Sequence, residues 1–116
     1  MKQQTISDMR RSYVEDLASG LKKIVAILAK KPEVQRVILF GSYASGRRDL
    51  FTDLDILVVM DSEQEFILRS AQLLTELHCG VDVDLLVYTP EEFSQMRKSG
   101  FLNHVLSDSV VVYERE

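Results

Sequence analysis

The segment Leu54–Met60 constrains the fold more than any other, because it is apolar at nearly every position. A strand that lacks polar alternation is typical of a sheet that is covered on both faces. We therefore expect this run to be a buried strand with helices packed on its sheet. Three other apolar and β-branched segments predict further strands: Val34–Phe40, Val81–Tyr88 and Val110–Tyr113.

Helical patterns separate these segments. An amphipathic helix is predicted over about residues 8–30, with Ser7 or Asp8 as its N-cap. Later helical segments are predicted at residues 43–46, at residues 63–78 with Gly80 as the C-cap, and from the capping box at Thr89 past Gly100. This order predicts an α/β (α+β) fold, in which helices pack on a single mixed β-sheet. The pattern leaves the direction of the individual strands open.

Length and composition limit the class of protein. With 116 residues, of which 46% are hydrophobic, the chain suits one domain over residues 1–116. The net charge of −4 argues against long DNA or RNA as a partner, because such binders carry a basic excess. Cys79 is the single cysteine, which excludes an intrachain disulfide and fits a reducing compartment. No window approaches the roughly 18 apolar residues of a membrane span, so we expect a soluble, cytoplasmic protein without a membrane partner.

Three aspartates are candidates for a metal site. Asp53 and Asp55 are two residues apart on an extended segment, so both side chains point to the same face. Two ionised carboxylates side by side repel each other unless a cation or proton lies between them, and Mg²⁺ prefers such oxygen ligands. Asp84 interrupts an apolar strand, where an unpaired charge is costly. Asp82 points to the same face, but Asp84 lies deeper in the apolar run and is the better third carboxylate.

A glycine–serine pair ends the first strand. Gly41 allows close approach of the backbone, and Ser42 can donate to a phosphate oxygen. A strand-ending turn without a ligand has the same sequence, so the pair alone leaves both interpretations open. Arg47 and Arg48 follow, either as phosphate-binding residues or as part of a solvated loop.

Together these motifs resemble the signature of the polymerase-beta-like nucleotidyltransferases. The resemblance lies in ILFGSYASG at residues 38–46, the ten residues between Ser42 and Asp53, and DLDILV at residues 53–58. The match is to the small free-standing members called minimal nucleotidyltransferases. Asp84 within VDLLVYTPEEF, and the closing FLNHVLSDSVVVYERE, are similar to the third-carboxylate strand and the tail of this group. The resemblance covers roughly residues 20–115 and implies a catalytic core over about residues 34–113, after the N-terminal helix at about 8–30.

The resemblance implies a Mg²⁺-dependent enzyme that moves a nucleoside monophosphate, AMP in the case of ATP, to an acceptor hydroxyl. Asp53 and Asp55 would ligate two Mg²⁺ ions, and Asp84 would ligate one of them and accept the proton of the attacking hydroxyl. Gly41 and Ser42 would hold the β and γ phosphates of the nucleoside triphosphate.

Small members of this family often act as antitoxins beside an all-helical partner protein, some of them by adenylylating a tyrosine of the toxin. The resemblance therefore implies a helical toxin-type protein as the acceptor. The alternative is a non-catalytic antitoxin of the same fold that neutralises its partner by contact; the three intact aspartates favour the enzyme. Exposed edge strands also leave a homodimer open.

One position departs from the family pattern. Many relatives read Gly-Ser-x-Ala-Arg-Gly, whereas Ser45 stands here in place of the arginine. Either Arg47 or Arg48 replaces that arginine by reaching back over the triphosphate, or the activity is weakened or lost.

Overall fold

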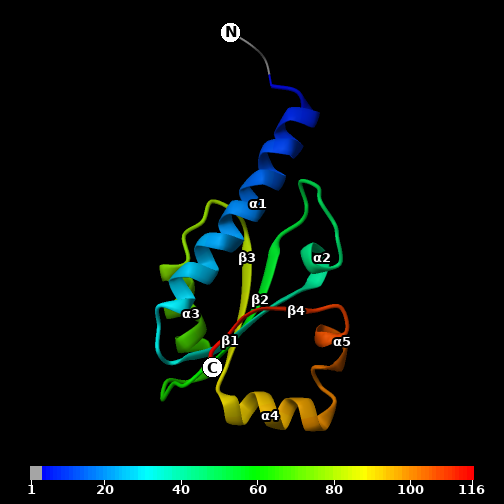
Figure 1. Ribbon diagram of the computed structural model, residues 1–116. Helices are drawn as coiled ribbons and strands as arrows, with labels where there is room; N and C mark the ends of the chain where they lie inside the picture. Colours follow the sequence, from blue (N-terminus) through cyan, green and yellow to red (C-terminus); the bar gives the residue numbers. More distant parts are fainter. Residues whose placement is uncertain (1–3) are drawn as a thin grey trace.

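The computed structural model describes residues 4–116, and Figure 1 shows their helices packed around one sheet. Strands and helices alternate along most of the chain, and two short helical segments precede the second and the last strand. The bounds of the elements are α1 Ile6–Ala29, β1 Val34–Phe40, α2 Gly41–Ala44, β2 Leu54–Met60, α3 Phe66–Glu76, β3 Val83–Tyr88, α4 Pro90–Ser99, α5 Asn103–Leu106 and β4 Val110–Glu114.

The strands of the described residues form one sheet in the order β3-β2-β1-β4. β1 is antiparallel to both β2 and β4, whereas β2 and β3 are parallel. The parallel pair is joined through α3, because parallel neighbours need a crossover connection. The predicted fold class, an α/β (α+β) fold with a mixed sheet, is confirmed, and the strand directions left open by the sequence are resolved.

Both faces of the sheet are covered, as the apolar run of β2 predicts. On one face, α1 and α3 enclose a core that contains Leu17, Leu73 and the even-numbered residues of β2. On the other face, Phe93 of α4 and Leu102, the N-cap of α5, pack against the odd-numbered residues Leu57 and Val59. Alternation along the strand thus gives β2 two buried faces.

The first helix begins earlier than predicted. Thr5, not Ser7 or Asp8, is the N-cap, and its hydroxyl accepts a hydrogen bond from the backbone N–H of Asp8 at 3.0 Å. The Asp8 carboxylate accepts from the Thr5 N–H in return, which makes a capping box. The fully buried residues of α1 begin only at Leu17, and its first turns extend past the end of the sheet (Figure 1).

The prediction for the third helix was wrong at both ends. α3 starts at Phe66, three residues after the predicted position, and Leu77 rather than Gly80 is its C-cap. Gly80 has a φ of 79°, so its left-handed backbone serves the turn into β3 instead. The apolar residues of α3 are not all covered, because Ile67 is 78% exposed.

The buried polar residue of α3 is Arg69, which is only 7% exposed. Its guanidinium pairs with the carboxylate of Glu92 and donates to the backbone carbonyls of Gln64 and Val87. Glu92 also belongs to the predicted capping box of α4, where its carboxylate accepts from the N–H of Thr89 at 2.8 Å. One buried cation therefore ties α3 and β3 to the start of α4.

None of the helices in the described part of the chain is long and apolar enough to cross a membrane.

Candidate active site

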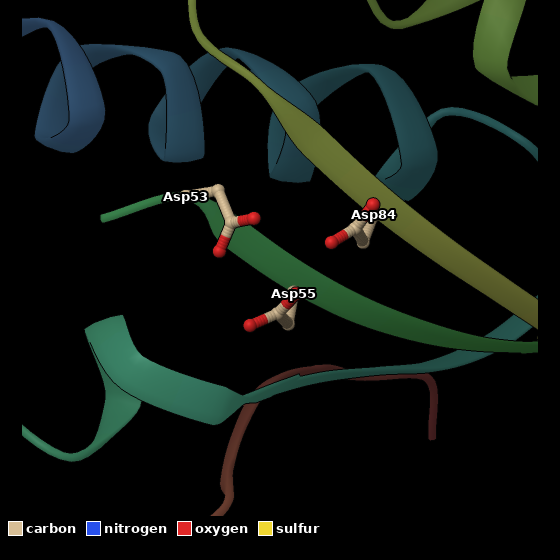
Figure 2. Close-up of side chains that lie close together, drawn as sticks. All are labelled: Asp53, Asp55 and Asp84. Atoms are coloured by element: carbon tan, nitrogen blue, oxygen red, sulfur yellow. The ribbon is translucent and has the colours of Figure 1, made fainter. Parts of the chain in front are cut away.

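Three carboxylates meet at the N-terminal ends of two parallel strands. Asp53 directly precedes β2, Asp55 is the second residue of β2, and Asp84 is the second residue of β3. The parallel register places Asp55 opposite Asp84. One oxygen of each carboxylate lies within 4.8 Å of the others, and Figure 2 shows the side chains gathered between the two strands. The structure therefore brings the three predicted aspartates into one cluster.

The cluster lies on the sheet face that carries α4 and α5. Asp55 alternates with Leu57 and Val59, which pack in the core of that face. Asp84 shares the face because it pairs with Asp55 across the two strands. Because α4 follows the C-terminal end of β3, it occupies the other end of this face, and Asp84 remains exposed to solvent.

The electrostatics of the cluster call for a positive charge. Burial first, and then repulsion by Asp53 and a hydrogen bond with Asp84, together raise the pKa of Asp55 to about 7. The pKa of Asp53 is also raised, first by burial and then by the charge of Asp84. Proton uptake or a cation relieves such repulsion. An all-oxygen set of clustered carboxylates fits Mg²⁺, which is bound through oxygen ligands.

The glycine–serine turn lies directly against this cluster. Gly41 has a φ of 75°, a left-handed backbone that favours glycine. A Cβ on Gly41 would lie 1.9 Å from Oδ2 of Asp55, so the carboxylate fills the space that any other side chain needs. The sequence predicted that the short helix begins at Tyr43, but α2 begins at Gly41. The backbone carbonyl of Ser42 accepts a hydrogen bond from the N–H of Arg47 at 2.9 Å. Gly41 therefore permits the close contact between β1 and the acidic site.

The two candidate arginines lie in the loop beyond α2. Nε of Arg47 pairs with the carboxylate of Asp49 at 2.8 Å. Arg48 donates to the carbonyl of Tyr43 at 2.8 Å, and its guanidinium lies 3.6 Å from the centre of the Tyr43 ring. Ser45 is the exposed C-cap of α2. Arg48 thus packs back onto the short helix, while a phosphate-binding role of either arginine stays a prediction.

Sequence reasoning missed a hydrogen-bond network behind Asp53. The hydroxyl of Tyr13 on α1 donates to the carbonyl of Thr52 at 2.7 Å, and Thr52 is 1% exposed. The Thr52 hydroxyl in turn binds Asp49, donating to its carboxylate and accepting from its N–H. Burial raises the pKa of Tyr13, and the nearby charges of Asp82 and Asp53 raise it further. Tyr13 and Thr52 are 39 positions apart, so no local pattern signals this contact.

Comparisons with known proteins agree with this geometry. The model of the family "Polymerase beta, Nucleotidyltransferase" matches residues 22–116. A Methanocaldococcus jannaschii protein named "Putative protein adenylyltransferase MJ0604" is 32% identical over 96 residues, which cover 81% of this chain and 95% of that protein.

Solved structures share the fold. A Sulfolobus solfataricus protein, named as a putative nucleotidyltransferase, superposes with a TM-score of 0.64 at 23% identity, over 91% of this chain and 87% of that one. A chain from a mutant form of the toxin–antitoxin pair MntA–HpeT superposes with a TM-score of 0.51 at 21% identity, over 83% of this chain and 71% of that one. The family match and the sequence relative together establish that the chain belongs to the polymerase-beta nucleotidyltransferase family, as one of its minimal members.

Proposed function

We propose that this protein transfers AMP from Mg²⁺-bound ATP to a hydroxyl group of a partner protein. The observation that carries the proposal is the cluster of Asp53, Asp55 and Asp84 against the turn at Gly41. Family membership supports nucleotidyl transfer as the reaction class. The cluster supports a metal-bound triphosphate as the donor, since three neighbouring carboxylates form an all-oxygen ligand set of the kind that Mg²⁺ prefers.

Asp53, Asp55 and Asp84 would hold the Mg²⁺, with two ions expected. The bound metal supplies the positive charge that stabilises an attacking oxygen and a departing pyrophosphate. Gly41 lets the triphosphate approach the backbone, and the hydroxyl of Ser42 donates a hydrogen bond to a phosphate oxygen. Arg47 and Arg48 neutralise phosphate from the loop beyond α2. In this arrangement the protein contributes position and charge neutralisation rather than a covalent intermediate.

The transfer is one displacement at phosphorus. The acceptor oxygen forms a bond to the α-phosphorus, and the bond between that phosphorus and the bridging oxygen breaks, so that pyrophosphate leaves. The proton of the acceptor hydroxyl passes to Asp84, which is exposed and lies on an edge strand. An exposed carboxylate at the edge is accessible to an acceptor that a second protein presents.

Two similar proteins support a protein acceptor. The Methanocaldococcus jannaschii relative is named as a protein adenylyltransferase, and the MntA–HpeT structure is that of a toxin–antitoxin pair. We therefore propose a small toxin-type protein with an accessible tyrosine as the acceptor. In the alternative function, this chain binds the same kind of partner and neutralises it by contact alone, without transferring AMP.

The proposal is tested by incubating the protein and a candidate partner with Mg²⁺ and ATP labelled at the α-phosphate, and in parallel with ATP labelled at the γ-phosphate. Only the α label is expected to appear on the partner. D55N should abolish the transfer, whereas D61N should retain it, because Asp61 is an exposed aspartate just past the other end of β2. Toxin neutralisation without label transfer, unchanged in D55N, would overturn the enzymatic proposal in favour of the contact-only antitoxin.

A further inference from the structure

A cleft lies beside the turn at Gly41, next to the acidic cluster. It is a cleft of about 390 Å³ between α2 and α5, the two short helices on the right of Figure 1. Its walls come from the end of β1, from α2 and from the segment that runs from α5 towards β4. Its volume falls in the range of small-molecule pockets, about 300–1,000 Å³.

The cleft shares a wall with the proposed transfer site. Phe40, which lines it, is the cross-strand partner of Asp55 in the β1–β2 register. Gly41 lines it as well, and the same glycine lies against the carboxylate of Asp55. The turn at Gly41 therefore has the carboxylates on one side and the cleft on the other. A triphosphate held at this turn has its nucleoside within reach of the cleft.

The cleft has a fixed wall. Leu102, immediately before α5, is fully buried, and Val105 packs against the same core. Ser107 donates from its hydroxyl to the carbonyl of His104 at 2.8 Å, which closes the end of the short helix. A wall anchored in the core is formed before a ligand arrives, so little ordering of the protein opposes binding.

The lining chemistry excludes phosphate and suits a heterocyclic base. Phe40 and Val105 supply apolar surface, and His104, Ser107 and Asp108 supply polar groups. The Asp108 carboxylate repels phosphate oxygens, so the charged part of a nucleotide belongs at the turn and not in the cleft. We propose that the cleft between α2 and α5 binds the base and ribose of the donor nucleotide, an inference that rests on the proposed function.

Asp108 also favours one kind of base. An ionised carboxylate only accepts hydrogen bonds, so it pairs with a base that presents a donor. The exocyclic amino group of adenine is such a donor, whereas the carbonyl that replaces it in hypoxanthine is an acceptor that the carboxylate repels. The cleft therefore selects ATP over inosine triphosphate (ITP), and Asp108 is the residue that makes the distinction.

The test compares the binding of ATP, ITP and inorganic tripolyphosphate by calorimetry, each with Mg²⁺ and without an acceptor. The affinity for tripolyphosphate depends on the turn and the carboxylates alone, because tripolyphosphate carries no nucleoside. The wild type is expected to prefer ATP over ITP by about tenfold or more, the value of a hydrogen bond to a charged group. D108N should reduce this preference to about twofold or less, because an amide both donates and accepts. Its tripolyphosphate affinity should stay within about twofold of wild type, and D61N serves as the matched control.

A substitution that fills the cleft tests the same proposal independently. His104 is an exposed residue of the cleft wall, so H104W fills the cleft without disturbing the core, and H78W places the same change at the exposed end of α3. H104W is expected to weaken the binding of ATP about tenfold and to leave the affinity for tripolyphosphate unchanged. If D108N and H104W both bind ATP and ITP like wild type, the cleft is not the base site and the proposed function stands. If the wild type binds neither ATP nor tripolyphosphate with Mg²⁺, both proposals fall.

Discussion

Replacing Asp55 by asparagine is expected to stabilise the metal-free protein while abolishing its activity. In the folded state Asp55 is pushed towards protonation by burial and by Asp53 and Asp84, and its pKa rises from 3.8 to about 7. A carboxylate whose pKa is raised by folding costs stability once the pH exceeds its unfolded pKa. The cost grows as the pH rises from about 4 to about 7 and is constant above that. Asparagine keeps the shape of the side chain and removes the charge.

The magnitude follows from the size of the shift. A rise of roughly three pKa units corresponds to at most about 4 kcal/mol, at 1.36 kcal/mol per unit. Asp55 is partly accessible to solvent, and water screens its repulsion, so we expect about 1–2 kcal/mol at about pH 8. For a chain of 116 residues this gain raises the melting temperature by about 4–8 °C. At about pH 4 most of the gain should be lost, because the wild-type carboxyl is then protonated in the folded state and only about half ionised in the unfolded state.

Thermal melts of wild type and D55N between about pH 4 and pH 8, with and without Mg²⁺, check this prediction. Mg²⁺ should stabilise the wild type more at high pH, because binding displaces the proton, and should leave D55N nearly unchanged. D61N, tested alongside, should show no pH-dependent gain. A D55N protein that is less stable than wild type at about pH 8, or a gain that does not grow with pH, would refute the argument from like-charge repulsion.

Three further substitutions test other parts of the structure. G41A should lower the free energy of unfolding by about 1–2 kcal/mol, measured by chemical denaturation, because alanine is strained at a positive φ. It should also slow AMP transfer about 10–100-fold in the label-transfer assay, because the Cβ of alanine displaces the carboxylate of Asp55. Y13F removes the bond to the Thr52 carbonyl, which should cost about 1 kcal/mol and lower kcat several-fold; a loss of stability at unchanged kcat would show that Tyr13 does not position the site. R69M removes the cation that pairs with Glu92 and donates to the carbonyls of Gln64 and Val87, so it should lower the free energy of unfolding by about 2–3 kcal/mol. Mg²⁺ binding at temperatures below the melting transition should stay intact, since α3 does not contribute a carboxylate to the cluster.

The parts of the fold that the sequence predicts well are those with local signals. β1 and β2 have the predicted bounds, because Pro32 and Gly41 delimit one and an apolar run defines the other. The capping box at Thr89 likewise marks the start of α4 correctly. At α1 the same kind of signal was present, but Thr5 and not a later residue supplies the cap.

The parts that the sequence could not provide depend on contacts between distant segments. Whether Asp84 meets Asp55 depends on the parallel register of β3 beside β2, which no local pattern encodes. The exposure of Ile67 has the same origin, since the apolar side of a helix is buried only where another element covers it. The contact of Tyr13 with Thr52 and the cleft beside α5 arise only when the chain is folded.

The position of β3 at the edge of the sheet makes the acidic cluster sensitive to local opening. β3 is an edge strand with β2 as its one neighbour in the sheet, yet it carries one of the three carboxylates. Edge elements open at lower free energy than the global unfolding of the domain. Partial release of β3 separates Asp84 from Asp53 and Asp55 while α1, β1 and β2 stay folded. We therefore expect activity to fall at urea concentrations below those at which far-ultraviolet circular dichroism changes, so that strand fraying, rather than loss of the fold, sets the conditions under which this protein works.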